Sequence, residues 1–560
     1  MSMIPDSSDP ETRPSDNRSV ATRRRFLAGL ATTVAGASGG ASAGDPTTVP
    51  RGLTADGTLS PLVANSVSWG GFSFSLPGEA RSSGPDNYPE WVVVYGDADD
   101  KSAIENWADR RDDREILDAD DDATRVTVRA PATDMGVVGV NAILGRGLAS
   151  FESVELIDFN LSHTFTEPIS SLDDETSVQS ELGFSWTEQI AAGTRSVPGA
   201  DGLAFGDDVE GASMADSREL VRADDAREDY SIDASDILIA VVDTGFNTAG
   251  GSILGDEDRL VPESWDAIDD ETVDEEGADA TRDENRHGSW VASAACADPS
   301  ASEHQGFAPN ADLLAIRALD EDGAGSTADI ASAIRHAADQ GADLLCLSLG
   351  TPMYSAEVER ALAYAVDEGT IPIAAAGNDR QVTRWVAHPA SSEYAISVGA
   401  ITGDRDAEDA LSSYFHNLGP HPGTTDGSGG ETAERGVDLV APGVKTTALV
   451  GTAAGSTREL TWSGTSMAAP MVVGVAALVL AEHEDLRGDV DGLRNHLREY
   501  GRPLPNVAPE EGGIMVDAYR AVAEEAFEDD HEDVLDDEAF SRGQAYDRLS
   551  DGMGGIVTRR

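Results

Sequence analysis

Residues 237–245 read Ile-Leu-Ile-Ala-Val-Val-Asp-Thr-Gly, an unbroken apolar run that ends at an acidic residue. A β-strand covered on both faces has such a run, whereas a strand with one wet face alternates apolar and polar residues. Four further runs of this kind follow, at 313–318, 344–349, 371–376 and 394–399. Helical patterns that end at a glycine lie between some of them, at 328–340 and 356–368. The alternation predicts a parallel α/β sheet with helices on both faces.

Polar residues with catalytic chemistry stand at the ends of these elements. Asp243 ends the first run, and Asn378 follows the run at 371–376. His287 and Ser466 each come just before a predicted helix, and the helix after Ser466 is long and apolar. Sites in open parallel sheets form beyond the carboxyl ends of the strands, so we expect these four side chains to converge.

These four residues are the components of nucleophilic catalysis. A nucleophilic serine needs a base for its proton, a carboxylate that orients the base, and donors aimed at the developing oxyanion. Ser466 at a helix N-terminus, His287, Asp243 and the Asn378 amide supply these groups. Each also has an ordinary interpretation, as a helix cap, a turn residue or a packed histidine. Together they favour a hydrolytic site.

Six short motifs between residues 219 and 522 share the order and context of one known family. They are Val241–Gly245 (VVDTG), His287–Ala292 (HGSWVA), Gly306–Asn310 (GFAPN), Leu347–Gly350 (LSLG), Ala375–Asn378 (AAGN) and Gly464–Pro470 (GTSMAAP). The region resembles the subtilases, the subtilisin-like serine peptidase family, in a form typical of halophilic archaea.

The resemblance implies a subtilisin-like fold and a serine endopeptidase that works through an acyl-enzyme intermediate. It places the catalytic Asp, His and Ser at Asp243, His287 and Ser466, and the oxyanion-hole Asn at Asn378. The edge that pairs with the substrate main chain by β-augmentation corresponds to Ser348, Leu349 and Gly350. The chemistry requires no cofactor, and the implied partners are protein or peptide substrates.

Two positions depart from the family pattern. The sequence has Gly288-Ser289-Trp290 where the family usually has Gly-Thr-His, and Met471 where it usually has His. Both lie within one helical turn of a catalytic candidate, and a small displacement there costs much activity. The alternative hypothesis is therefore a catalytically weak or inactive protein that binds peptides or partners on the same fold.

The chain before the peptidase-like region has the order of a small α+β unit. Strand-like patterns occur at 91–95, 124–129 and 151–159, and helix-like patterns at 102–111 and 135–148. Residues 91–160 resemble the propeptide of such enzymes, a folding helper and inhibitor removed by self-cleavage. We expect linkers at 44–90 and 161–216, a peptidase domain at 217–526 that begins with a helix over 217–228, and an acidic tail at 527–560.

Residues 1–43 have the pattern of an export signal. Arg23-Arg24-Arg25-Phe26-Leu27 precedes a short apolar run, and Ala41-Ser42-Ala43 matches an A-x-A cleavage site. The paired arginines resemble the twin-arginine signal, so the twin-arginine export machinery is an expected partner. We expect a secreted protein and no membrane domain in its mature form.

The net charge of −64 restricts the function further. The chain has 103 acidic and 39 basic residues, and lysine occurs only at Lys101 and Lys445. Such a negative field repels nucleic acid and anionic membranes, so no nucleic-acid partner is expected. Acidic residues spread along the whole chain are typical of a protein adapted to high salt, where ions screen self-repulsion.

The acidic loop at 256–284 offers carboxylates that suit a structural calcium ion, although no EF-hand spacing is present. Subtilases often carry structural calcium, but no metal ligand is assigned here. The two cysteines, Cys296 and Cys346, are expected to be buried free thiols; a disulfide between them is the alternative.

Overall fold

The computed structural model describes residues 67–68, 73–74 and most of 80–526. The gaps after residue 80 are 85–86, 122, 136–146, 152–153, 166–202, 205–210, 250, 274–276, 278–279, 381–384, 404–405, 414, 420–435 and 508–510. The predicted signal peptide at 1–43 and the acidic tail at 527–560 lie outside the described residues.

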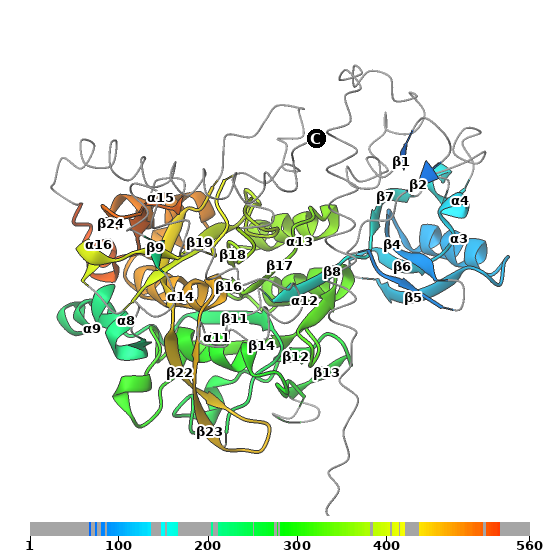
Figure 1. Ribbon diagram of the computed structural model, residues 1–560. Coiled ribbons are helices and arrows are strands. Elements are labelled where there is room, and N and C mark those ends of the chain that lie inside the picture. Colours follow the sequence, from blue (N-terminus) through cyan, green and yellow to red (C-terminus); the bar gives the residue numbers. More distant parts are fainter. Residues whose placement is uncertain are drawn as a thin grey trace, which may run out of the picture.

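A parallel sheet forms the centre of the molecule (Figure 1). Its main strands in spatial order are β14 (Asp312–Arg317), β11 (Leu238–Asp243), β16 (Leu344–Leu347), β18 (Ile371–Ala375), β19 (Ile396–Thr402) and β21 (Leu439–Val444). The five predicted strands are confirmed. The sixth, β21, escaped prediction because Pro442 and Gly443 interrupt its apolar pattern.

Short strands extend the edges of this sheet. They are β12 (Trp265–Asp266) and β13 (Glu271–Thr272) beyond β14, β25 (Ile514–Met515) and β24 (Arg502–Pro503) beyond β21, and β20 (Ser412–Ser413) with β9 (Leu203–Ala204) beside β19. A separate hairpin of β22 (Thr446–Gly451) and β23 (Thr457–Trp462) projects below the sheet in Figure 1, and β10 (Ala212–Ser213) pairs with it.

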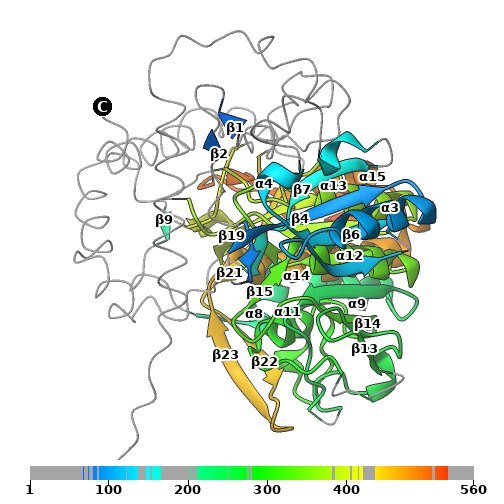
Figure 2. The ribbon, with the colours of Figure 1, turned by 90° about the vertical axis from the view of Figure 1, so that its right-hand side faces the viewer.

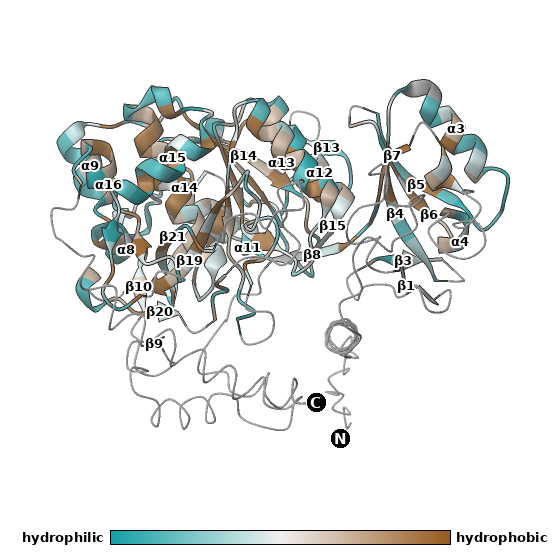
Figure 3. Cartoon of the chain, turned by 90° about the horizontal axis from the view of Figure 1, so that it is seen from above, coloured by the Kyte–Doolittle hydropathy of each residue, from teal (hydrophilic) through white to brown (hydrophobic). Residues whose placement is uncertain are grey.

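Helices cover both faces of the sheet. α11 (His287–Cys296) packs against α14 (Thr465–Glu482), and α12 (Thr327–Asp339) packs against α13 (Ala356–Asp367). Further helices of the body are α8 (Met214–Leu220) and α9 (Ala223–Tyr230), which precede β11, and α15 (Val490–Glu499) and α16 (Ala518–Ala523), which follow α14. Figure 3 shows hydrophobic residues concentrated on the strands and on α14, with hydrophilic residues along outer helices such as α9 and α15.

Helix α14 is the one helix among the described residues that is long and apolar enough to cross a membrane. Its residues from Thr465 to Leu480 are all buried inside the body. Burial accounts for its apolar composition, because a helix that is hydrophobic on every side is either a core helix or a membrane span.

The N-terminal unit has its own sheet and core. Its strands are β3 (Ser82–Ser83), β4 (Tyr88–Tyr95), β6 (Arg125–Arg129), β5 (Glu115–Asp120) and β7 (Val154–Phe159), and its helices are α3 (Ala98–Ala108) and α4 (Ala132–Met135). Trp91 stacks on Phe159, with ring centroids 5.0 Å apart, at the centre of a hydrophobic core separate from that of the body.

This unit differs from the sequence prediction in two respects, and a third prediction lies mostly outside the described residues. Its sheet begins at Ser82, earlier than the predicted start at residue 91. Strand β5 was not predicted because most of its residues are exposed and it lacks an apolar pattern. Most of the helix predicted at 135–148 lies outside the described residues. Before the unit, β1 (Val67–Ser68) and β2 (Ser73–Phe74) pair as a hairpin within the predicted linker.

The two units meet at the starts of α12 and α13, and Figure 2 shows the N-terminal unit in front of α12. Nη1 of Arg125 donates to the carbonyl of Ala328 at 2.8 Å. The amide of Ala356 donates to Oδ2 of Asp158 at 2.8 Å. Asp158 thereby satisfies one of the N–H groups that a helix leaves without a partner in its first turn.

The predicted linker at 161–216 contains β8 (Ser162–Phe165), β9 and β10, and the first of these follows the N-terminal unit onto the body. Strand β8 lies between β15 (Ala324–Ser326) and β17 (Leu349–Gly350), antiparallel to both. The helix predicted over 217–228 is instead two helices, α8 (Met214–Leu220) and α9, because Arg222 between them adopts a left-handed conformation with φ of 56°.

Candidate active site

Asp243 and His287 are in direct contact. Asp243 is the last residue of β11, and His287 is the first residue of α11. Nδ1 of His287 lies 2.7 Å from Oδ1 of Asp243, and both side chains are buried. The amide of Thr244 also donates to Oδ1 of Asp243, at 2.7 Å. The contact orients the imidazole so that Nε2 faces away from the carboxylate.

Tight main-chain packing sets the position of this pair. A Cβ atom on Gly288 would lie 2.2 Å from the carbonyl oxygen of Gly245, so only glycine fits after His287. Gly245 itself has a φ of 107°, a conformation that favours glycine. The two glycines therefore allow the end of β11 and the start of α11 to touch.

Ser466 lies in the first turn of α14, which packs against α11. Its hydroxyl donates to the carbonyl of Ser348 at 3.1 Å, and the hydroxyl of Ser348 donates to the carbonyl of Ser466 at 3.1 Å. Ser466 is thereby tied to the end of β16, one strand away from Asp243. Its place at a helix N-terminus favours negative charge beside it.

The amide of Asn378 is held in one orientation. Its Oδ1 accepts hydrogen bonds from both the main-chain N–H and the hydroxyl of Thr465, each at 3.0 Å. Nδ2 faces Gly464, where an added Cβ atom would approach it to 3.1 Å. The amide hydrogens of Asn378 are thus directed at the segment that immediately precedes Ser466.

Ser348, Leu349 and Gly350 lie at an edge that already carries a strand. Leu349 pairs with Phe165 and Gly350 with Thr164, so β8 occupies the position beside β17. The predicted strand at 344–349 ends early, at Leu347, and the carbonyl of the next residue, Ser348, accepts from the hydroxyl of Ser466. The structure thus brings Ser348 and Ser466 together. It also pairs β8 with the neighbouring edge, β17.

The two residues that depart from the family pattern are both packed inside the body. The indole N–H of Trp290 donates to the carbonyl of Leu460 on β23 at 3.0 Å, and its ring is fully buried. Met471 is also fully buried in the core. Both side chains therefore fill the interior of the body, which removes the specific reason for expecting a displaced site.

The sequence did not lead us to two residues that hold the candidate site in place through hydrogen bonds. Thr465 holds Asn378, and Asp283 binds the main chain at the start of α11. Thr465 lies inside the motif Gly464–Pro470, so its place beside Ser466 could have indicated this role from the sequence. Asp283 lies in the acidic loop, where it is one of many carboxylates and has no local pattern that sets it apart.

The calcium ion suggested by the loop at 256–284 has no cluster of acidic side chains around it among the described residues. No group of three His, Cys, Asp or Glu side chains among them could hold a metal. Asp266 in the loop forms an ion pair with Arg317 instead. The two cysteines are buried and unbonded to each other, as expected, and burial raises the pKa of the Cys296 thiol to about 11.

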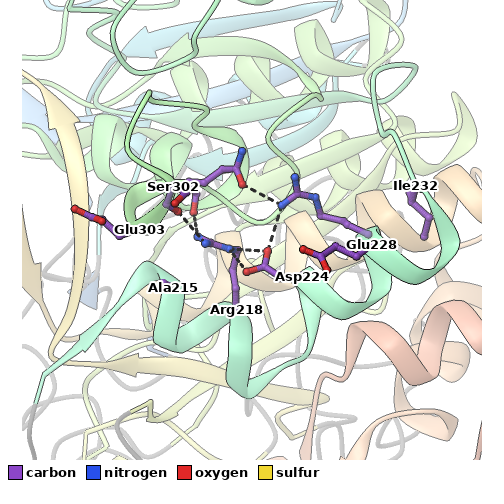
Figure 4. A pocket seen from close by; sticks show the side chains of 9 residues that line it. Ala215, Arg218, Asp224, Glu228, Ile232, Ser302 and Glu303 are labelled. Carbon is purple, nitrogen blue, oxygen red and sulfur yellow. Dashed lines mark hydrogen bonds and ion pairs between the residues drawn. The ribbon is translucent and has the colours of Figure 1, made fainter.

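A pocket of about 530 Å³ lies between α8, α9 and the loop that follows α11 (Figure 4). The guanidinium of Arg218 crosses it, donating to the carbonyls of Ser302, at 2.9 Å, and Gln305, and to the carboxylate of Asp224, at 3.0 Å. Arg218 is 3% exposed. These oxygen atoms are of the kind that cations prefer, and an internal arginine already binds them.

An imidazole bound to a carboxylate, with a serine at the start of a contacting helix, is the arrangement that serine hydrolases use. Among models of protein families, the one described as "Subtilase family" matches residues 234–499 of the sequence. Subtilisin BL from Lederbergia lenta is 31% identical over 279 residues, which are 50% of this chain and 88% of subtilisin BL. The chain belongs to the subtilase family.

Relatives from halophilic archaea are also similar. Halolysin from Haloferax mediterranei is 36% identical over 307 residues, which are 54% of this chain and 52% of halolysin. The halolysin-like extracellular serine protease Nep from Natrialba magadii is 33% identical over 294 residues, 51% of this chain and 47% of Nep. The chain spans about half the length of these two relatives.

The fold also matches a solved structure. The crystal structure of fervidolysin from Fervidobacterium pennivorans, a keratinolytic enzyme related to subtilisin, aligns with a TM-score of 0.54. The alignment covers 79% of this chain and 62% of that chain, at 18% identity. The likeness shows a shared fold and confirms the predicted subtilisin-like architecture.

Proposed function

We propose that this chain is a serine endopeptidase in which Ser466 is the nucleophile, His287 the base and Asp243 the residue that orients the base. The observation that carries the proposal is the 2.7 Å contact between His287 and Asp243, with Ser466 at the start of the contacting helix. The family membership and the named peptidase relatives support the same reaction class.

In this mechanism, Oγ of Ser466 attacks the carbonyl carbon of the scissile peptide bond while Nε2 of His287 takes the hydroxyl proton. The tetrahedral intermediate collapses, the C–N bond breaks, and His287 delivers the proton to the leaving amine. A water molecule then attacks the acyl-enzyme in the same way, and the carboxylic acid leaves as Ser466 regains its proton.

The oxyanion of the intermediate binds to the amide of Asn378 and to the main-chain N–H of Ser466. The two hydrogen bonds from Thr465 to Oδ1 of Asn378 support this role, because they fix the direction of the amide N–H groups. Donors fixed before the reaction need no reorganisation when the charge develops, which is the main source of their effect.

The substrate main chain pairs with Leu349 and Gly350 by β-augmentation. The support is strand β8, an extended segment that pairs with this edge and with β15. We propose that β8 is the end of a propeptide formed by the N-terminal unit, so that the precursor blocks its own cleft. Processing then falls between Phe165 at the end of β8 and Ala212 at the start of β10.

Export through the twin-arginine pathway and function in high salt complete the proposal. The Arg23-Arg24 pattern supports the first, and the net charge of −64 together with the halolysin relatives supports the second. Normal export of an Arg23→Lys/Arg24→Lys double variant would contradict the export route. Full activity in dilute buffer would contradict the salt requirement.

The experiment that tests the proposal compares the full precursor with its Ser466→Ala variant, both expressed in molar KCl. Intact mass and N-terminal sequencing are expected to show that the wild type loses an N-terminal segment ending within 165–211, and that the variant stays whole. If both folded proteins stay whole and neither hydrolyses peptides after nicking by an added protease, the binding-protein alternative replaces the peptidase.

A further inference from the structure

Asp283 is a fully buried carboxylate beside the candidate site that the proposed reaction does not use. It receives hydrogen bonds on both oxygens. The amide of Arg286 donates to Oδ1 at 2.6 Å, and the amide of Ser289 donates to Oδ2 at 2.8 Å. These two N–H groups flank His287, so Asp283 holds the first turn of α11 on both sides of the histidine.

The same carboxylate also reaches the strand that carries Asp243. The hydroxyl of Thr244 donates to Oδ1 of Asp283 at 2.9 Å, while its oxygen accepts from the amide of Gly288 at 2.9 Å. Thr244 directly follows Asp243, and Gly288 directly follows His287. A short chain of hydrogen bonds through Asp283 and Thr244 therefore connects the neighbours of both residues.

The main chain of Asp283 is fixed as well. The side chain of Asn247 donates to the carbonyl of Asp283 at 2.7 Å and accepts from its amide at 3.3 Å. Arg286, between Asp283 and His287, has a φ of 83°, a left-handed conformation that a side chain other than glycine adopts only at a cost. The hydrogen bond from the Arg286 amide to Asp283 holds this turn.

The Asp283 carboxylate is buried near a second carboxylate, Asp243, and among hydrogen-bond donors. Burial raises the pKa of Asp283, and the nearby Asp243 raises it further, while the amides of Arg286 and Ser289 lower it. The donors around Asp283 are of the kind that stabilise an ionised carboxylate. These donors bind both oxygens of Asp283 and hold the carboxylate in one orientation.

We propose that Asp283 is a positioning residue that sets the geometry of the Asp243–His287 pair, acting through Thr244 and the first turn of α11. The inference rests on the proposed peptidase function. It assigns Asp283 no contact with substrate. It predicts an effect on the chemical step, with little effect on substrate binding.

The test is Asp283→Asn in the full chain, assayed on a peptide substrate in molar KCl. We expect kcat to fall by about 10- to 100-fold with KM changed less than about 2-fold, because a misplacement of about 1 Å costs that much.

The matched control is Asp517→Asn. Asp517 is also buried, accepts from the amide of Arg520 at 3.1 Å, and pairs with Arg222, far along the chain from the candidate site. Asp517→Asn should lower the melting temperature but leave kcat unchanged. If Asp283→Asn behaves like this control, the proposal is wrong.

Thr244 provides a second test that does not remove the buried carboxylate. Thr244→Val keeps the shape but breaks the link to Asp283 and to Gly288, so kcat should fall; Thr244→Ser should restore most of the loss. If Asp283→Asn does not fold, the comparison of Thr244→Val with Thr244→Ser tests the positioning role instead. Equal kcat values for Thr244→Val and Thr244→Ser would overturn the proposal. A wild type without Ser466-dependent activity would instead refute the proposed function itself.

Discussion

At the scale of single residues, Thr465 links the candidate oxyanion donor to the candidate nucleophile. Its hydroxyl donates to Oδ1 of Asn378 and accepts from the amide of Gly377 at 3.1 Å. It is buried and immediately precedes Ser466. One side chain thus couples the loop after β18 to the start of α14, so the oxyanion site depends on a residue that touches no substrate.

Thr465→Val should therefore weaken the chemical step. The amide of Asn378 keeps one of its two hydrogen bonds from Thr465 and gains freedom to turn, so we expect kcat to fall by about 10-fold, or about 1.4 kcal/mol of transition-state stabilisation. Steady-state kinetics on a peptide substrate measures this, with Thr465→Ser as the control that keeps the hydroxyl. A loss confined to KM would contradict the proposed role.

At the scale of elements, the N-terminal unit supplies caps to helices of the body. Oδ2 of Asp158 accepts from the amide of Ala356 at the start of α13, and Oδ1 of Asn160 accepts from the amide of Ala328 in α12 at 3.4 Å. A helix cap contributes about 0.5–2 kcal/mol. Two helices of the body thus gain stability from contacts that exist only while the N-terminal unit is docked.

Asp158→Ala should loosen this docking. After self-processing, we expect a smaller fraction of the N-terminal unit to co-elute with the body in size-exclusion chromatography in molar KCl, because the α13 amide loses its acceptor. Asp97→Ala is the control: Asp97 accepts from the amide of Asp100 at the start of α3, inside the same unit. Equal release by both variants would show that Asp158 acts only on the stability of its own unit.

The sequence predicted elements with a strong apolar pattern and missed those without one. The strands β11, β14, β16, β18 and β19 are covered on both faces and had continuous apolar runs. Strand β23 has mostly exposed residues, and its alternation gave no signal. The break between α8 and α9 depends on one left-handed residue, Arg222, whose side chain pairs with Asp517 nearly 300 residues later.

The candidate site was predictable where its residues lie inside motifs and unpredictable where they depend on distant contacts. Asp243, His287, Asn378 and Ser466 all stand at element ends that the pattern located. The role of Asp283 depends on Thr244, which lies 39 positions earlier in the chain. No local propensity encodes such a contact, because only the folded main chain brings the two residues together.

At the scale of the whole molecule, the docked precursor buries groups that prefer to remain neutral. His163 on β8 is fully buried between the units. Its Nε2 lies 3.0 Å from Oγ1 of Thr327, which also accepts from the amide of Leu161 at 3.0 Å. The Thr327 hydroxyl can accept from Nε2 or donate to it, so the contact suits a neutral imidazole in either tautomer.

Acid should consequently release the N-terminal unit after self-processing. Burial lowers the pKa of His163 from its ordinary value of 6.5 to about 4. A released strand binds a proton below pH 6.5, whereas the docked strand binds one only near pH 4. Docking is therefore at full strength above pH 6.5 and weakens as pH falls towards 4, by up to a few-hundred-fold in affinity.

Size-exclusion chromatography of the processed protein between pH 7.5 and 4.5, in molar KCl, measures this release. His163→Gln is the matched variant, because its side-chain oxygen can accept from Thr327 and it does not titrate; its docking should vary little over this range. Unfolding is not a suitable measurement, since burial also lowers the pKa of His416 to about 4 inside the body. Release of both proteins at the same pH would show that acid acts through groups other than His163.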